Sequence, residues 1–407
     1  MVVKPGYKQT EVGVIPEIWE VKKIKEIATI LTGYTPPTHD ETNYGDEFLF
    51  VSPGDMGEIK YITTSEKMLS RKGFAITRRF PKGSILFVCI GSTIGKCGIA
   101  QVELTSNQQI NAILPSSLFS IDYLYYFVSM ISPIIRASAG EQAVPIVNKS
   151  RFSENIVALP SLPEQFIIAS SLSDLDVLIT SLDRCITKKR SLKQAATQDL
   201  LTGKRRLPGF IEEWASKRLG EVLIRVVNGA VYKPTNSFGL PITRIETISD
   251  GTISFDRIGY AEPTHVLANY RLECGDILFS HINSLDHIGK VAIFNGESEL
   301  YHGMNLLLLR AGPSIDFKFL FYWLGSYQGR KKSISLAKQA VNQASINTNE
   351  LKGIELPYPT LPEQLAIATV LSDMDAELAA LVQKRDKTKA IKQGMMQELL
   401  TGRIRLT

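Results

Sequence analysis

One short run of glycine and lysine has the residue types of a phosphate-binding loop. In GSTIGKC, Gly91, Gly95 and Lys96 resemble the loop whose backbone N–H groups cradle phosphate oxygens. The run is one residue short, however, and Cys97 stands where such loops have Ser or Thr. The related IGK tripeptide that starts at Ile288 lacks the first glycine altogether. We therefore interpret both runs as strand-to-turn glycines and predict no nucleotide site.

Other catalytic and metal chemistry lacks its usual residue patterns. No H-x-x-x-H pair, no CxxC pair and no Asn-Pro-Pro-[Phe/Tyr] or Asp-Pro-Pro-Tyr tetrapeptide occurs, and the acidic residues are scattered. The cysteines are interpreted as free thiols of a reducing cytoplasm. We predict no catalytic residue, no metal site and no enzymatic activity for this chain. The histidines are His39, His265, His281, His287 and His302, and the cysteines are Cys89, Cys97, Cys185 and Cys274.

The segments Gly33–Pro81 and Asn228–Cys274, with a few residues just beyond the second, carry side-chain donors suited to the phosphates and base edges of double-stranded DNA. Arg and Lys can pair with guanine edges and Asn with adenine, although most such residues contact only phosphate. Any one of them can equally be a solvated surface residue. The candidate DNA-binding residues are Lys60, Tyr61, Thr63, Thr64, Arg71, Lys72, Arg78, Arg79, Lys233, Arg244, Arg257, Asn269, Arg271, His281, Asn283 and His287.

Composition describes an ordinary globular chain of two or more domains. It has 407 residues, 44% of them hydrophobic and 21% charged, with a net charge of +5 that permits nucleic-acid binding without demanding it. The N-terminus has no apolar core for a signal peptide, and the apolar run Ile121–Ile135 is too short to span a bilayer. We expect a cytoplasmic protein that does not interact with membranes.

The elements that must position these residues are organised by an internal repeat. The stretch Leu162–Leu207 returns as Leu361–Leu406 at a constant offset of 199, with 21 of 46 positions identical. Pro163 and Pro362 suit a first helical turn, and Gly203 and Gly402 suit a C-terminal cap. Each copy is therefore predicted to be a helix of about 40 residues, or about 60 Å.

Apolar residues in both copies follow a heptad-like spacing with a polar interruption at the same place. Such a long amphipathic helix must bury its stripe, and the other copy is the nearest equivalent partner. Packing of each helix on its own globular domain is the alternative. The predicted pairing residues are Ile168, Leu172, Leu175, Ile179, Leu182, Ile367, Leu371, Met374, Leu378 and Leu381.

Basic residues gather at the interruption. Two interpretations remain equal: a solvated helix face, or a face toward DNA that adds affinity independent of sequence. These residues are Lys188, Lys189, Arg190, Lys193, Lys387, Lys389 and Lys392.

The globular parts repeat as well. Gly275–Phe294 echoes Gly83–Ala100, whereas Gly33–Pro81 and Asn228–Cys274 show no convincing alignment. We predict an α+β fold with two mixed α/β domains joined by two long antiparallel coiled-coil helices, related by a pseudo-two-fold axis. The predicted blocks are 1–160 and 208–360 for the domains, and 161–207 and 361–407 for the helices.

LPEQ followed by a long helix that ends in LLTGK or LLTGR, twice, resembles a type I restriction–modification specificity subunit. The resemblance covers nearly the whole chain. It implies two target recognition domains that each read one half of a split DNA sequence. It implies that the helices set the spacing between the two half-sites and dock two modification subunits. It also implies that restriction subunits join the complex. It places S-adenosylmethionine, ATP and Mg on those partner subunits and no cofactor in this chain.

The sequence thus predicts a non-catalytic DNA-recognition subunit. The alternative is an interaction scaffold in which two modules on a coiled coil bind proteins rather than DNA. A self-contained restriction–methyltransferase is disfavoured, because no block of the chain is left for a catalytic domain.

Overall fold

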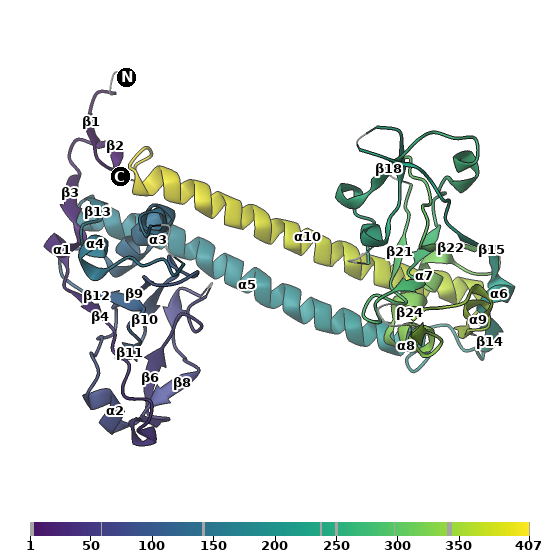
Figure 1. The fold of residues 1–407 in the computed structure, drawn as a ribbon, viewed down its shortest axis with the longest axis horizontal. Helices are drawn as coiled ribbons and strands as arrows, with labels where there is room; N and C mark the ends of the chain where they lie inside the picture. The colour runs from purple at the N-terminus through teal and green to yellow at the C-terminus, as the bar shows by residue number, and fades with distance from the viewer. Residues whose placement is uncertain are drawn as a thin grey trace. The chain divides into compact units, whose positions relative to one another are not determined.

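The computed structural model describes residues 4–57, 59–140, 143–236, 238–248, 251–296, 298–339 and 344–406. The chain divides into two compact units, Met1–Asp183 with Lys384–Thr407 (unit 1) and Arg184–Gln383 (unit 2). Each unit holds one globular part together with a portion of both long helices, α5 (Leu162–Leu201) and α10 (Leu361–Leu400) (Figure 1). The four consecutive blocks expected from sequence are a different division, and their boundaries stay predictions.

Unit 1 is built on a five-stranded sheet of order β4-β12-β9-β10-β7 and a four-stranded sheet of order β11-β6-β8-β5, with the small pairs β1-β2 and β13-β3. Its strands are β1 (Tyr7–Thr10), β2 (Gly13–Pro16), β3 (Glu20–Lys23), β4 (Ile30–Thr32), β5 (Tyr44–Gly45), β6 (Phe48–Val51), β7 (Tyr61–Ile62), β8 (Lys67–Leu69), β9 (Ile85–Val88), β10 (Cys97–Ala100), β11 (Thr105–Ser106), β12 (Ile110–Ile113) and β13 (Ile156–Leu159). Its short helices are α1 (Ile24–Ile27), η1 (Glu41–Asn43), α2 (Arg71–Ala75), α3 (Ile121–Ala137) and α4 (Lys149–Ser153).

Unit 2 has a four-stranded sheet of order β15-β22-β19-β21, the three-stranded sheets β16-β18-β17 and β20-β24-β23, and the pair β14-β25. Its strands are β14 (Ala215–Arg218), β15 (Leu223–Asn228), β16 (Pro234–Thr235), β17 (Leu240–Ile242), β18 (Gly259–Ala261), β19 (Ile277–Phe279), β20 (Ile282–Asn283), β21 (Val291–Ile293), β22 (Leu307–Ala311), β23 (Lys338–Gln339), β24 (Ala344–Ser345) and β25 (Glu355–Tyr358). Its short helices are α6 (Leu219–Val222), η2 (Ile245–Ile248), η3 (Phe255–Arg257), η4 (Leu267–Tyr270), α7 (Phe317–Gly325), α8 (Tyr327–Ser335) and α9 (Thr348–Lys352).

The two units share one scaffold, which confirms the predicted internal repeat. The order β4-β12-β9-β10 in unit 1 corresponds to β15-β22-β19-β21 in unit 2, with antiparallel neighbours throughout. The Gly83–Ala100 stretch supplies β9 and β10, and its echo supplies β19 and β21. The divergent segments differ in structure too: the first provides strands of the β11-β6-β8-β5 sheet, and the second forms the β16-β18-β17 sheet.

The helix α3 begins at Ile121 and continues through Pro133 to Ala137. Proline in a helix interior removes a backbone hydrogen bond. Ile135, which follows it, is fully buried in the core of unit 1. Burial of this side chain offsets the lost bond, which the local sequence could not reveal.

Both ends of each long helix are buried in a core that contains side chains of the other long helix and of a globular part. Pairing between the helices and packing on the globular domain, the two alternatives from the sequence, therefore both occur. The core of unit 1 contains Ile168 and Leu172 from α5 alongside Leu399 and Leu400 from α10, all packed with the domain's own side chains. In unit 2 the corresponding residues are Ile367 and Leu371 from α10 with Leu200 and Leu201 from α5. Of the other predicted pairing residues, Leu182 is buried, whereas Leu175, Ile179, Met374, Leu378 and Leu381 are partly buried.

A buried carboxylate clasp ties the start of each long helix to the end of the other. In unit 1 both guanidinium bonds from Arg405 to Glu164 are 2.8 Å, and the Trp19 indole donates to the same carboxylate at 3.2 Å. In unit 2 Arg206 reaches Glu363 at 2.5 and 2.7 Å, and the Trp214 indole donates at 2.9 Å. The helices are therefore antiparallel within each unit.

A tight turn after each long helix brings the arginine of the clasp, Arg405 or Arg206, to the buried carboxylate. Gly402 has φ +69°, and a Cβ there would lie 2.3 Å from Cδ of Pro16. Gly203, at the equivalent place after α5, has the same φ and lies against Trp214. The predicted C-cap glycines are thus confirmed, and only glycine accepts both the conformation and the close approach.

Ion pairs between the helices occupy the polar interruption of the apolar stripe. In unit 1 Lys392 lies 2.5 Å from Asp176, and Arg385 lies 3.4 Å from Asp183. In unit 2 Lys189 lies 2.7 Å from Glu377, and Lys193 pairs with Asp375. Lys193 and Lys392 are equivalent in the repeat, as are Asp176 and Asp375. Opposite charges at these paired positions along the two helices specify their register.

The clasp predicts a large loss of stability when its carboxylate is neutralised. Glu363 is only 1% exposed, and removing one member of a buried ion pair leaves the other uncompensated. Because Arg206 is about a quarter exposed, we expect Glu363→Gln to lower the free energy of unfolding of unit 2 by about 2–3 kcal/mol. Urea titration followed by hydrogen exchange of unit 2 peptides measures this change.

Glu262→Gln is the matched control, because Glu262 forms an exposed ion pair with Lys233 in the same unit. Its effect should stay within about 0.5 kcal/mol. Equal effects of the two substitutions would show that the clasp does not stabilise unit 2.

Candidate nucleic-acid interface

Predicted DNA contacts of unit 1 gather on and directly after α2. Lys72 pairs with Asp40 at 2.8 Å, and the guanidinium of Arg79 lies 5.1 Å from the centre of the Phe74 ring. These partners hold the basic side chains in place while leaving them open to solvent. Thr63 and Thr64 are exposed after β7, and the exposed basic residues are Arg71, Lys72, Arg78 and Arg79.

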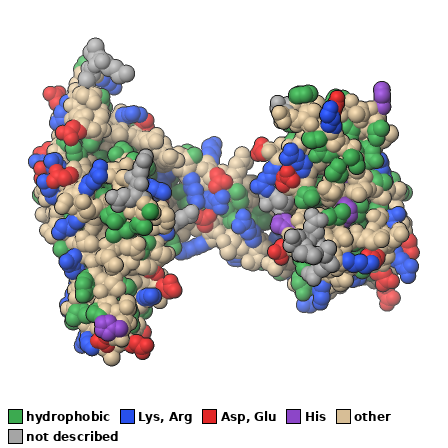
Figure 2. Space-filling model, in the orientation of Figure 1, with side chains coloured by type: hydrophobic (Ala, Val, Ile, Leu, Met, Phe, Trp, Pro, Cys, Tyr) green, Lys and Arg blue, Asp and Glu red, His purple; other side chains and the backbone are tan. Residues whose placement is uncertain are grey.

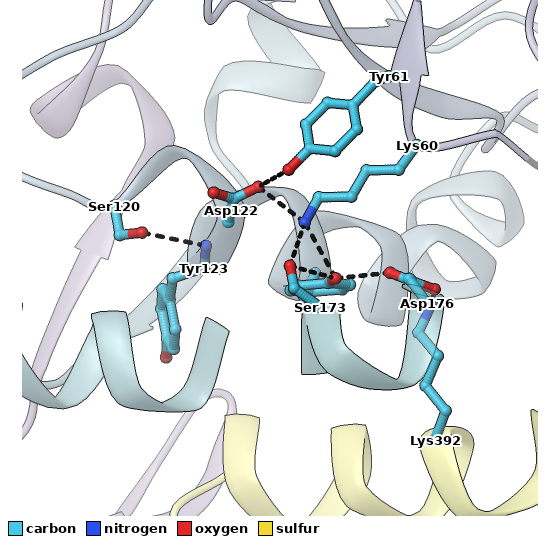
Figure 3. A network of polar contacts seen from close by, with 9 residues as sticks. Lys60, Tyr61, Ser120, Asp122, Tyr123, Ser173, Asp176 and Lys392 are labelled. Atoms are coloured by element: carbon cyan, nitrogen blue, oxygen red, sulfur yellow. Dashed lines mark hydrogen bonds and ion pairs between the residues drawn. The ribbon is translucent and has the colours of Figure 1, made fainter. Parts of the chain in front are cut away.

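Lys60 belongs to the same predicted set, but the structure places it inside unit 1. Its side chain is 6% exposed. Its Nζ lies 2.7 Å from Asp122 and donates to Tyr126 at 3.0 Å and to Ser173 of α5 at 2.8 Å (Figure 3). Tyr61 donates to Asp122 as well, at 3.1 Å.

Burial lowers the pKa of Lys60 below its usual range, and Asp122 opposes that effect. The same Nζ lies 4.3 Å from the centre of the Tyr126 ring. Lys60 is therefore a packing residue that joins the first insert to α3 and α5. The expectation that it contacts DNA is corrected by this burial.

Predicted contacts of unit 2 lie mainly around the insert sheet β16-β18-β17. All five residues expected there are exposed: Lys233, Arg244, Arg257, Asn269 and Arg271. Three of the basic residues are positioned by nearby carboxylates, Lys233 by Glu262 at 3.1 Å, Arg244 by Glu246 at 3.0 Å and Arg271 by Glu299 at 3.7 Å. The insert thus presents oriented hydrogen-bond donors to solvent.

The three remaining candidates of unit 2 are less available. Burial lowers the pKa of His281 to about 4, and its side chain is buried, so it is neutral and enclosed at neutral pH. His287 and Asn283 are partly buried and lie within hydrogen-bonding distance of Ser284 and Ser280. His281 is therefore removed from the set of candidate contacts.

The structure adds a third interpretation of the basic helix residues, which is ion pairing between the two long helices. Lys189, Lys193 and Lys392 pair with carboxylates of the other helix, as described above. Lys188, Arg190 and Lys387 are exposed. Figure 2 shows basic side chains interspersed with acidic ones on the visible face of each unit. No single basic stripe follows from this arrangement of the described residues.

Sequence reasoning missed a polar network that occurs once in each unit. In unit 1 the Tyr126 hydroxyl donates to Asp176 at 2.5 Å and lies 3.1 Å from Ser173. In unit 2 Tyr322 donates to Asp375 at 2.8 Å and to Ser372 at 3.3 Å, and burial raises its pKa to about 12. The signal was present: these serines and aspartates are identical at the 199-residue offset.

The glycine–lysine run forms a turn, as predicted. Lys96 donates to the Pro53 carbonyl at 3.1 Å, and Gly91 and Gly95 adopt φ of +95° and +103°. Burial raises the pKa of Cys89 and of Cys97 to about 12, so neither thiol ionises at neutral pH. Within the described ranges, no cluster of three His, Cys, Asp or Glu side chains could hold a metal.

One described helix, α5, is long and apolar enough by length and composition to cross a membrane. This is weak support for a membrane role, because core helices pass the same test. The buried residues Ile168 and Leu172 place one face of α5 in the core of unit 1, and its Asp176 and Lys193 pair with α10.

Known proteins share this fold over nearly the whole chain. A solved S subunit of a type I restriction–modification system from M. genitalium has a TM-score of 0.60 at 15% identity, covering 97% of this chain and 98% of that one. A second structure, described as the basis of complex assembly and conformational transition of the type I R-M system, has a TM-score of 0.60 at 18% identity and covers 96% and 99%. At these identities the likeness concerns the fold alone.

Three relatives that are similar in sequence share one description, the specificity subunit of a type I restriction enzyme. The MjaX specificity subunit of Methanocaldococcus jannaschii, a putative one, is 45% identical over 195 residues, which span 47% of this chain and 46% of that relative. The MjaVIII specificity subunit of the same organism is 24% identical and covers 96% and 94%. The EcoKI specificity subunit of Escherichia coli is 23% identical and covers 97% and 90%.

A model of the type I restriction modification DNA specificity domain matches residues 16–191 and again 211–392. Its two matches coincide with the repeated scaffold, each taking one globular part and most of the long helix that follows. The chain belongs to the type I restriction modification DNA specificity family.

Proposed function

We propose that this chain is the DNA sequence-recognition subunit of a type I restriction–modification complex and performs no catalysis itself. One observation carries the proposal: the same scaffold occurs twice and bears two structurally unlike inserts, Gly33–Pro81 and Asn228–Cys274. A constant frame with two different exposed surfaces suits the reading of two different half-sites. Family membership supports the same role.

The exposed donors of the inserts, together with the partly buried Asn283 and His287 just beyond the second insert, form the proposed DNA interface. Their Arg and Lys side chains match phosphates and guanine edges, and Asn269 matches an adenine edge. Lys60 and His281 are excluded because both are buried. The proposed contacts are Tyr61, Thr63, Thr64, Arg71, Lys72, Arg78 and Arg79 in unit 1, and Lys233, Arg244, Arg257, Asn269, Arg271, Asn283 and His287 in unit 2.

The long helices are the proposed docking surface for modification subunits. Large apolar side chains on their outer faces are exposed, for example Phe166 at 60%, Val177 at 69% and Leu365 at 49%, which is typical of surfaces that bind partners. We propose two modification subunits, with restriction subunits joining through the complex in the cytoplasm. S-adenosylmethionine, ATP and Mg would then be bound by those subunits.

The same exposed apolar faces suit a second candidate function, a coiled-coil scaffold that binds only proteins. Mobility shift of this chain with its modification subunit on a random duplex library separates the two. Retention of a defined two-part sequence supports the recognition subunit. Retention without any sequence enrichment would favour the scaffold.

We expect the purified chain, free of other subunits, to transfer no methyl group to DNA, to cleave no duplex and to hydrolyse no ATP. The proposal assigns all three reactions to the partner subunits. Radiolabelled methyl transfer, plasmid cleavage and phosphate release measure them. The same assays on the reconstituted complex are the positive control, and turnover by the lone chain at a comparable rate would contradict the proposal.

Exchange of Gly33–Pro81 for the matching segment of a relative should change one half of the methylated sequence and leave the other intact. The reason is that this insert belongs to unit 1 alone. Genome-wide mapping of methylated adenines reads the outcome. Exchange of Asn228–Cys274 is the reciprocal control, and a simultaneous change of both halves in either variant would contradict independent reading.

A paired insertion tests whether helix length sets the unread spacer. Four helix-forming residues are added between Asp183 and Arg184 and four between Gln383 and Lys384, which leaves every ion pair described within each unit in register. Each helix lengthens by about 6 Å, which corresponds to about two base pairs. We expect methylated sites with an unchanged pair of half-sites and a spacer longer by one or two base pairs.

The control is the insertion in α5 alone, which shifts one helix against its partner and should reduce affinity without a defined longer spacer. Full methylation by the paired variant at the original spacing would show that the helices do not determine it.

A further inference from the structure

A cavity of about 1160 Å³ lies in unit 2, between α7, β21 and the adjoining parts of α5 and α10. Its wall includes the Tyr322–Ser372–Asp375 network together with Lys193, Lys318 and Phe321. No role described so far uses this space. Its counterpart in unit 1 shows what kind of group belongs there.

The two units can be superposed residue by residue at this place. Ser120 caps α3 and its N–H donates to Gln165, whereas Asp316 caps α7 and its N–H donates to Gln364. Counting from these equivalent caps, Tyr126 corresponds to Tyr322, as their matching networks require. The same count pairs Tyr125 with Phe321 and Asp122 with Lys318.

In unit 1 the corresponding space is filled by Lys60 of the first insert. Its Nζ contacts Asp122, Tyr126 and Ser173 and lies 5.5 Å from the centre of the Tyr125 ring. In unit 2 the counterparts of all four residues line the cavity: Lys318, Tyr322, Ser372 and Phe321. The second insert provides no lysine that contacts them among the described residues. The cavity is therefore the open equivalent of the Lys60 pocket.

The charge at the entrance is reversed between the units. Where unit 1 has Asp122, which binds a lysine, unit 2 has Lys318, which is exposed and has no ion pair within the part of the chain that the structure describes. Lys193 is already paired with Asp375. Arg330 also lines the cavity, and its Nε–H is buried without a hydrogen-bond partner. A carboxylate is the group that complements these donors.

We propose that this cavity receives an acidic side chain, with an apolar neighbour, from a modification subunit. This rests on the proposed function. A protein segment fits better than a DNA phosphate for two reasons. Ile253, Val291 and Ile293 give the wall an apolar part that a phosphate cannot use but an apolar side chain can. In unit 1 the same space is filled by a protein side chain, that of Lys60.

Unit 1 is closed by its own insert, so the two modification subunits dock differently. Only the subunit bound at unit 2 inserts the acidic side chain. The asymmetry makes the proposal specific, because a general loss of docking would weaken both binding events.

The test uses the full chain titrated with its own modification subunit in a calorimeter. We expect Lys318→Glu to weaken one of the two binding events by about thirtyfold and Lys318→Ala by about tenfold, with the other event unchanged. Lys331→Glu is the matched control, because Lys331 is exposed on α8 and does not line the cavity. Circular dichroism confirms that each variant is folded.

A photo-crosslinking residue, p-benzoylphenylalanine in place of Lys318, identifies the occupant. The expected product joins position 318 to a modification-subunit peptide with Asp or Glu beside an apolar residue. Replacing that acid by lysine should restore binding to the Lys318→Glu chain.

Other outcomes overturn the proposal. Crosslinking to DNA, or a Lys318→Glu variant that loses DNA affinity but binds both modification subunits normally, would assign the cavity to a phosphate. Unchanged binding of both ligands would show that the cavity is not a docking site. If the unsubstituted chain binds no modification subunit at all, the proposed function itself fails, which is a distinguishable result.

Discussion

The rest of the structure depends on the ion pair and hydrogen bonds of a carboxylate that is buried at the first turn of each long helix. Desolvation of Glu164 or Glu363 costs several kcal/mol unless strong hydrogen bonds replace the lost water. The replacements are a guanidinium from the segment after the other helix and an indole N–H. Each domain core can therefore close only when both long helices are present. Unit 1 in particular joins the two ends of the chain, as Tyr7 also shows by donating to the Gly402 carbonyl.

The polar interruption complements these clasps. A seam of leucine and isoleucine alone tolerates sliding by a heptad, because one apolar contact replaces another. The pairs of Lys392 with Asp176 and of Lys193 with Asp375 do not tolerate it, since a shifted register leaves partly buried charges without partners. Apolar burial thus stabilises the helix pair, and charge pairing selects one alignment within each unit.

The scaffold and the inserts have different roles in each unit. The shared strands and helices bury their side chains and repeat closely, whereas the inserts keep their donors exposed and differ. Lys60 is the exception, since the first insert returns this residue to the helices and seals unit 1. The described residues of the second insert leave the matching space open, next to Lys318. Sequence divergence therefore changes the fit of the domain to its helices as well as its outer surface.

The repeat was predictable because the chain resembles itself at an offset of 199 residues, and the apolar stripes because their spacing is periodic along each copy. The ends of both long helices were predictable because they depend on signals within a few residues. Pro163 at a first turn and Gly203 after a last turn act locally. Whether a polar residue is buried depends on distant partners. Lys60 meets Ser173 across 113 positions, and Arg405 meets Glu164 across 241. Only the tertiary structure brings such residues together, and so only it decided that Lys60 packs inside unit 1 while Arg79 stays exposed.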